Sequence, residues 1–148
     1  MLFRSPVELI SQHVVNYESS NGTEGYLLNG SPVVILTSKG AKTGRMRKVP
    51  LMRVEHNGQY AIVASSAGSD QHPGWYYNLI REPHVQIQDG PIKGDFVARE
   101  IRGDERSTWM SRALVTWPDF AEYERKTTRS IPVFLLTAVE RQGAGSSV

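Results

Sequence analysis

Short strand-like segments recur at close spacing along this chain, and turn residues separate them. Six segments have the composition of strands: 33–36, 49–55, 60–64, 85–87, 96–101 and 133–136. Asn57-Gly58 lies between two of them, and this dipeptide between apolar runs is a strong hairpin signal. The sequence therefore predicts an α+β fold in which about six antiparallel strands form a small β-barrel with peripheral helices.

Helical patterns flank these strands. Residues 5–8 resemble a helix start, with serine as the cap and proline in the first turn. The side chains that follow share one helical face: Leu9, Ile10, His13, Val14 and Tyr17. We expect this face to pack on its own domain, with a weak peripheral contact to a membrane surface as the alternative. Further helices are predicted from Pro73 to about Arg81, after a cap at Asp104, and after Pro118.

Length and composition limit the class of protein. The 148 residues are expected to form one barrel domain: residues 1–32 an N-terminal helix and loop, 33–140 the barrel core, and 141–148 a flexible tail. The chain has no cysteine, which excludes disulfides, thiolate metal sites and cysteine nucleophiles. No apolar stretch approaches the ~20 residues that span a bilayer, and the N-terminus lacks a signal-peptide pattern. The predicted location is the cytoplasm.

Positive charge is concentrated on one strand pair and its turn. Between Val33 and Val54 the chain has no carboxylate but six basic residues: Lys39, Lys42, Arg45, Arg47, Lys48 and Arg53. Glycines at 40 and 44 punctuate this segment, so backbone N–H groups can approach a ligand while the basic side chains supply charge. Such a loop suits a phosphate or a polycarboxylate. The alternative is a solvated hairpin tip without a ligand.

Several familiar sites are excluded. The two glycines that a nucleotide-triphosphate P-loop needs are replaced by Leu36 and Ala41, and no G-x-G-x-x-G fingerprint occurs. No two histidines have metal-ligand spacing on one helix, and His56 and His72 are expected to be structural or solvent-exposed. Serines 65 and 66 lack the context of a nucleophile. A chain with an anion-holding loop, several aromatic residues and no nucleophile is suited to positioning a reactive cofactor.

An ordered set of motifs resembles the deazaflavin-dependent nitroreductase family. The motifs lie between about Val33 and Glu140, at residues 36–47, 49–51, 63–65, 72–79, 117–123 and 129–133. The resemblance implies a split β-barrel related to barrels that bind flavin mononucleotide (FMN). It also implies use of coenzyme F-420, a deazaflavin with a phosphodiester and an oligoglutamate tail, whose negative charge agrees with the basic loop.

The resemblance also implies roles for individual residues. Lys42 and Arg47 would contact the phosphate and tail, and Thr43 and Gly44 would shape the loop. The ring system would be lined by Pro50, Met52, Ala64, Ser65 and Ser66, with Asn78 as a further cofactor contact. Trp75 is expected to be core packing.

The same motifs predict an oxidoreductase that passes a hydride from reduced coenzyme F-420 to a small quinone-like, nitro or enone acceptor. Trp117, Phe120 and Tyr123 would face the acceptor, backbone groups near Ser65 would position the ring, and Tyr123 or water would return a proton. Ala41 and Ser66 replace basic residues of some family members, and only one phenol remains near the acceptor, so activation of bicyclic nitroimidazoles is not expected.

Two alternatives to the deazaflavin enzyme stay open from the sequence. The same fold could hold FMN, or the chain could be a non-enzymatic module whose basic loop binds nucleic acid or acidic lipid. The second is disfavoured because no aromatic residue lies between Val33 and Val54 to stack on bases. The partner expected is therefore a small molecule and not nucleic acid, and a homodimer remains an open assembly.

Overall fold

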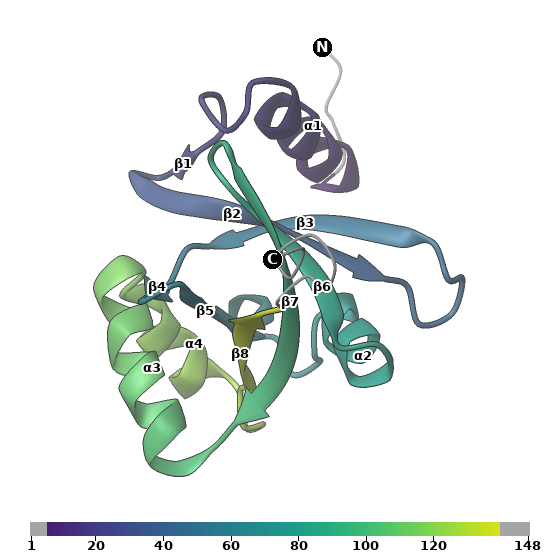
Figure 1. Ribbon diagram of the computed structural model, residues 1–148. Helices are drawn as coiled ribbons and strands as arrows, with labels where there is room; N and C mark the ends of the chain where they lie inside the picture. Colours follow the sequence, from purple (N-terminus) through teal and green to yellow (C-terminus); the bar gives the residue numbers. More distant parts are fainter. Residues whose placement is uncertain (1–5, 140–148) are drawn as a thin grey trace, which may run out of the picture.

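A computed structural model describes residues 6–139 of the chain (Figure 1). The helices are α1 (Pro6–Ser19), α2 (Gly74–Arg81), α3 (Gly103–Thr116) and α4 (Asp119–Lys126), with a short 3-10 turn η1 (Ser66–Gly68). The strands are β1 (Leu27–Leu28), β2 (Ser31–Lys39), β3 (Met46–Met52), β4 (Glu55–His56), β5 (Gln59–Val63), β6 (His84–Asp89), β7 (Ile92–Ile101) and β8 (Val133–Ala138).

All strand pairs are antiparallel, and they form one curled sheet. Its order is β1-β2-β6-β7-β8-β5-β4, and β3 pairs with β2 off this path. Among the described strands β3 pairs with β2 alone, whereas β5 pairs with β4 and β8. The barrel is therefore split between β3 and β5. This confirms the predicted α+β class and the antiparallel split barrel.

Three hydrophobic clusters bury both faces of the central strands. On β2, Val34 and Leu36 point into the barrel interior, whereas Val33 and Ile35 pack beneath α1. On β5, Ile62 joins the interior cluster, whereas Val63 packs towards α3 and α4. Figure 1 shows α1 over β2 and β3, and α3 with α4 beside β4 and β5. Because both faces of these strands are buried, their sequences are continuous apolar runs and do not alternate between apolar and polar residues.

The six predicted strands correspond to the six long strands, but one boundary prediction is wrong. The segment predicted as a single strand over 49–55 is β3, a break at Arg53 and Val54, and then β4. The break is needed because β3 pairs with β2 while β4 pairs with β5. The Asn57-Gly58 hairpin between β4 and β5 is confirmed, and both turn residues have a positive φ (53° and 80°) as this turn requires.

The helices match the sequence prediction with two differences. On α1, Val14 and Tyr17 are buried as expected, but Leu9 and Ile10 are 55% and 43% exposed. Asp104 was expected to cap the third helix, and this is wrong: Arg102 holds the capping position and Asp104 lies in the first turn of α3. The described part of the chain has no helix long and apolar enough to cross a membrane.

A buried polar network fastens α1 and β1 to the sheet. The Asp89 carboxylate, only 8% exposed, accepts hydrogen bonds from the Tyr60 hydroxyl (2.6 Å), the Tyr26 hydroxyl (3.1 Å) and Arg53 Nε (2.8 Å). The Tyr17 hydroxyl accepts from the Gly90 N–H at 2.8 Å. Burial raises the pKa of Tyr17 to about 12, and burial together with the hydrogen bond to Asp89 raises the pKa of Tyr60. These phenols therefore stay neutral and serve the fold as donors.

The predicted division of the chain at residues 32 and 140 stays a prediction. The sheet begins before residue 33, since β1 pairs with the first residues of β2. The expected tail at 141–148 and the predicted serine cap at position 5 lie outside the described residues.

Candidate cofactor cleft

Two adjoining cavities of about 880 and 440 Å³ lie along the split in the barrel. They share four lining residues: Ile10, Ser66, Pro73 and Trp75. We call the two together the cleft. Its larger half lies against the β2–β3 hairpin and α2, and its smaller half lies between β3, the end of β5, and α4. The cleft is thus basic at one end and apolar at the other.

The turn between β2 and β3, which we call the hairpin tip (residues 40–45), closes on itself. The Gly40 N–H donates to Arg45 O at 2.7 Å, and the Gly44 N–H donates to Gly40 O at 2.9 Å. Gly44 has a φ of +72°, and a Cβ added to Gly40 would lie 2.9 Å from Thr43 Oγ1. The glycines are therefore required by the tip itself. Only residues 40–45 are loop, because β2 extends to Lys39.

Asn78 of α2 holds this tip in place. Its Oδ1 accepts from the Ala41 N–H at 2.9 Å, and its Nδ2 donates to Ser38 Oγ at 3.4 Å. The side chain also lines the larger half of the cleft. Asn78 therefore joins the helix to the basic hairpin at the place where a ligand would lie.

The fold neutralises two of the six basic side chains. Lys48 pairs with Glu18 of α1 at 2.5 Å, and Arg53 pairs with Asp89 at 2.8 Å and Glu55 at 3.6 Å. The other four make no ion pair with a carboxylate among the described residues: Lys39, Lys42, Arg45 and Arg47. All four are exposed, and the Arg47 guanidinium donates only to Thr43 Oγ1 at 3.4 Å. Positive charge at the hairpin tip and on the strand residues beside it is thus left available to an anion.

The smaller half of the cleft has apolar walls. Pro50, Leu51 and Met52 of β3 form one side, and the aromatic residues of the α3–α4 corner form another. Phe120, 5% exposed, also belongs to the core cluster with α3, and its ring meets that of Tyr123 edge-on at 6.1 Å. The Trp117 indole N–H donates to the Tyr123 hydroxyl at 3.3 Å. That hydroxyl keeps its own proton for another acceptor.

Most of the residues predicted from the sequence line the cleft. The larger half includes Lys42, Thr43, Arg47, Ser66 and Asn78, and the smaller half includes Pro50, Met52, Ser65, Ser66, Trp117, Phe120 and Tyr123. Two do not: Ala64 is fully buried beneath the wall, and Gly44 lies on the other side of the hairpin tip. Their direct contact with a cofactor is therefore not supported by the geometry, although Gly44 does shape the tip.

Sequence reasoning missed several lining residues. Ile10, Leu28 and Val33 bring α1, β1 and β2 to the cleft, and Pro73 and Tyr77 bring α2. The exposure of Leu9 and Ile10 at the start of the predicted apolar face was not visible in the helical spacing. Trp75 packs in the core as predicted, at 8% exposure, but it also lines both halves. Among the described residues no group of three histidine or carboxylate side chains could hold a metal.

Comparisons with known proteins agree on one family. The family model described as F420H(2)-dependent quinone reductase matches residues 9–138. The F420H(2)-dependent quinone reductase Rv1261c of Mycobacterium tuberculosis (strain ATCC 25618 / H37Rv) is 33% identical over 135 residues, which cover 88% of this chain and 91% of the relative.

Two solved structures are similar over most of the chain. The structure of an F420-H2 dependent reductase (FDR-A) has 50% sequence identity and a TM-score of 0.68, covering 72% of this chain and 94% of that one. A structure described as a domain-swapped dimer has 43% identity and a TM-score of 0.72, covering 86% of this chain and 93% of that one.

Proposed function

The chain belongs to the F420H(2)-dependent quinone reductase family, and we propose that its cleft binds coenzyme F-420 and a quinone-like acceptor side by side. As a member of this family it is an oxidoreductase that uses the reduced deazaflavin. The quinone-like acceptor is proposed from the family's name. Nitro compounds and enones are the alternative acceptors.

The observation that carries the proposal is the polarity of the cleft. At one end lie Lys42 and Arg47, which make no ion pair among the described residues, and apolar walls lie at the other end. Coenzyme F-420 has the same polarity, since its phosphodiester and glutamate tail are anionic and its ring system is flat and largely apolar. Lys42 and Arg47 would hold the anionic part through charge-assisted hydrogen bonds. Pro50, Met52 and Trp75 would contact the ring.

The chain's own residues position the reactants and exclude water. When bound, the reduced deazaflavin supplies the hydride. Ser65 is buried, at 7% exposure, and lines the smaller half of the cleft, where it would help to position the ring. Tyr123 can return a proton to the reduced acceptor, because its hydroxyl accepts from Trp117 and retains its own proton.

Two other occupants of the cleft remain as outcomes of a test. FMN would use the same cationic residues through its phosphate, and the titration below therefore compares the two cofactors. A nucleic acid would need aromatic residues among the basic ones, and the hairpin tip has none.

The test is a binding titration with oxidised and reduced coenzyme F-420 beside FMN. We expect binding of the deazaflavin to be tighter and to weaken with added salt, since exposed charges at the tip are screened. Tighter binding of FMN would overturn the cofactor assignment. Turnover of reduced deazaflavin with a soluble quinone, a nitroaromatic compound and an enone then ranks the acceptors.

Two further interactions stay predictions: a homodimer and a peripheral contact with a membrane. A homodimer is proposed because one similar structure is described as a domain-swapped dimer, and analytical ultracentrifugation tests it. A peripheral membrane contact through α1 rests on the exposed side chains of Leu9, Ile10 and Val15. Sedimentation with lipid vesicles tests that contact. The cytoplasmic location expected from the sequence likewise stays a prediction.

A further inference from the structure

One wall of the cleft has an unfavourable backbone conformation. Ser66, Ala67 and Gly68 of η1 have φ values of 47°, 52° and 81°, all in the left-handed region. Residues other than glycine rarely adopt this conformation, and such strain persists only where surrounding contacts impose it. Because Ser66 and Ala67 line the smaller half of the cleft, the strained segment is part of the proposed binding site.

A single arginine binds the backbone on both sides of this segment. Arg129 Nη2 donates to Ala64 O at 3.1 Å and to Ser65 O at 2.9 Å, before the left-handed residues. Its Nε donates to Ser69 O at 2.8 Å, after them. The planar guanidinium thus fixes the distance between the two ends of the turn, which a lysine ammonium could not do.

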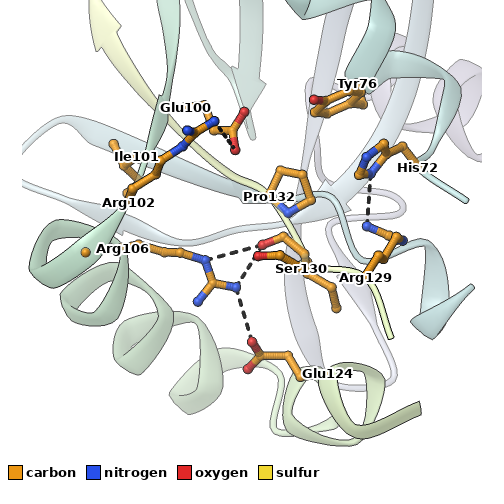
Figure 2. Close-up of a pocket in the computed structure, with 12 residues that line it drawn as sticks. His72, Tyr76, Glu100, Ile101, Arg102, Arg106, Glu124, Arg129, Ser130 and Pro132 are labelled. Atoms are coloured by element: carbon orange, nitrogen blue, oxygen red, sulfur yellow. Dashed lines mark hydrogen bonds and ion pairs between the residues drawn. The ribbon is translucent and has the colours of Figure 1, made fainter. Parts of the chain in front are cut away.

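Arg129 reaches this position from a separate pocket. Figure 2 shows it beside His72, to whose Nδ1 its Nη1 lies at 3.0 Å. This pocket, of about 560 Å³, shares no lining residue with the cleft. Arg129 makes no ion pair among the described residues; its hydrogen-bond partners there are backbone carbonyls and an imidazole nitrogen. Its position is therefore explained by the loop that it holds and not by a carboxylate partner.

The other side of the loop is closed by α4. A Cβ added to Gly68 would lie 3.2 Å from Tyr123 Cα and 3.0 Å from a Lys126 side-chain carbon. The loop is thus held between α4 and the Arg129 guanidinium. If the guanidinium is removed, the loop keeps its two internal backbone bonds, from the Gly68 N–H to Ser65 O and from the Ser69 N–H to Ser66 O. It also keeps a long bond from Lys126 Nζ to Ala67 O (3.5 Å) and one from the Gln71 N–H to Ser69 Oγ (3.2 Å).

We propose that Arg129 is a positioning residue for the cofactor: it holds residues 65–69 in the strained conformation that forms the wall beside the deazaflavin ring. This inference rests on the proposed function of the cleft. Arg129 itself does not touch the reacting atoms, and it acts through the backbone of Ala64, Ser65 and Ser69.

Arg106 provides a matched control. It lines the same pocket (Figure 2), donates twice to Ile131 O at 2.8 and 3.3 Å, and pairs with Glu124 at 3.1 Å. Neither of these partners lines the cleft. Arg106→Gln therefore removes a comparable set of bonds without releasing the loop.

The experiment compares Arg129→Gln, Arg129→Lys and Arg106→Gln by two measurements. The first is hydrogen exchange of the Gly68 and Ser69 amides in the ligand-free protein, and the second is affinity for oxidised coenzyme F-420. For Arg129→Gln we expect about tenfold faster exchange and about tenfold weaker binding, the scale of one or two lost hydrogen bonds. Arg129→Lys should fall between this variant and the wild type, and Arg106→Gln should leave both values near those of the wild type.

The outcomes separate this inference from the proposed function. Wild-type protein that does not bind the deazaflavin would overturn the proposed function and this inference with it. If the wild type binds, and Arg129→Gln matches Arg106→Gln in both exchange and affinity, the inference alone is overturned. If Arg129→Gln does not fold, the comparison of Arg129→Lys with Arg106→Gln decides by the same two values.

Discussion

Arg47 and Arg53 stand near the two ends of β3, and their surroundings are opposite. Arg53 is half-buried, ion-paired with Asp89 and Glu55, and part of the network that includes Tyr26 and Tyr60. Arg47 is exposed on β3 beside the hairpin tip, and among the described residues its guanidinium donates only to the Thr43 hydroxyl. The charge of Arg53 is used in ion pairs that hold the strands together, whereas the charge of Arg47 is available to an anionic ligand.

The contrast extends to the surroundings of each arginine. Around Asp89 three donors converge on one buried carboxylate. Around the cleft, the basic side chains make no ion pair with a carboxylate among the described residues, and the backbone of residues 66–68 has positive φ angles. A region whose charges and hydrogen-bonding groups are paired within the fold contributes to stability. A region with unpaired charges or a strained backbone is a candidate for ligand binding. Four predictions test where this division holds.

The largest stability effect is expected at Phe120. This residue has both roles, because it is buried in the core and also lines the cleft. Phe120→Ala should lower the free energy of unfolding by about 3–5 kcal/mol, and it should alter the preference among acceptors more than it alters deazaflavin affinity. Urea denaturation and turnover with several acceptors measure the two effects. Phe96→Ala is the control, because Phe96 is buried in the barrel interior away from the cleft. An unchanged acceptor preference in Phe120→Ala would assign this residue to the core alone.

Asp89→Asn should affect stability without affecting binding. The substitution leaves the half-buried Arg53 without its nearest carboxylate and weakens the acceptor of two tyrosine hydroxyls, so we expect a loss of about 2–4 kcal/mol. Chemical denaturation measures this loss, and a titration should give an unchanged affinity for coenzyme F-420. Weakened binding in a folded variant would mean that the two regions are coupled.

Tyr123→Phe should affect turnover without affecting the fold. Removing the hydroxyl takes away the proposed proton donor, and we expect turnover to fall by about ten- to a hundredfold for acceptors that need a proton. Melting temperature and deazaflavin affinity should change little. Trp117→Phe is the control, since it removes the indole donor and leaves the phenol. Undiminished turnover in Tyr123→Phe would assign proton return to water.

The smallest effect concerns pH and His72. Burial, followed by the positive charge of Arg129, lowers the pKa of His72 below its usual 6.5, while Glu100 opposes the shift. Since the folded-state pKa is below the unfolded one, stability is complete above about pH 6.5 and declines as the pH falls towards the lowered value. His72→Gln, which keeps an acceptor for Arg129 but does not titrate, should flatten this part of the profile. An identical profile in the variant would show that other groups cause the acid loss.

Much of the fold could be predicted because its signals are local. Asn57-Gly58 specifies its own turn, and the apolar runs of β2, β5 and β8 reflect burial on both faces. The break at Arg53 and Val54 could not be predicted, because it depends on β3 and β4 pairing with different strands. The cap of α3 could not be predicted either, because the capping residue is Arg102, which precedes Gly103 with a φ of +62°.

The site divides in a similar way. The basic hairpin and the aromatic corner were visible as composition, and most of their residues do line the cleft. Which charges stay unpaired was not visible, because Lys48 and Arg53 find carboxylates at Glu18 and Asp89, far away in sequence. The contacts of Arg129 with Ala64, Ser65 and Ser69 likewise join segments about sixty residues apart. The roles assigned to the individual site residues stay predictions.

The most direct test of the account measures stability and deazaflavin affinity for Arg47→Ala and Arg53→Ala together. For Arg47→Ala we predict weaker binding by about 1–3 kcal/mol, the scale of a lost charge-assisted hydrogen bond, with the free energy of unfolding within about 0.5 kcal/mol of the wild type. For Arg53→Ala we predict the reverse: a loss of stability of about 2–4 kcal/mol with unchanged affinity. Lys42→Ala should follow Arg47→Ala. If Arg47→Ala binds the deazaflavin as the wild type does, or if both variants lose affinity equally, the division between structural and ligand-binding charge is contradicted.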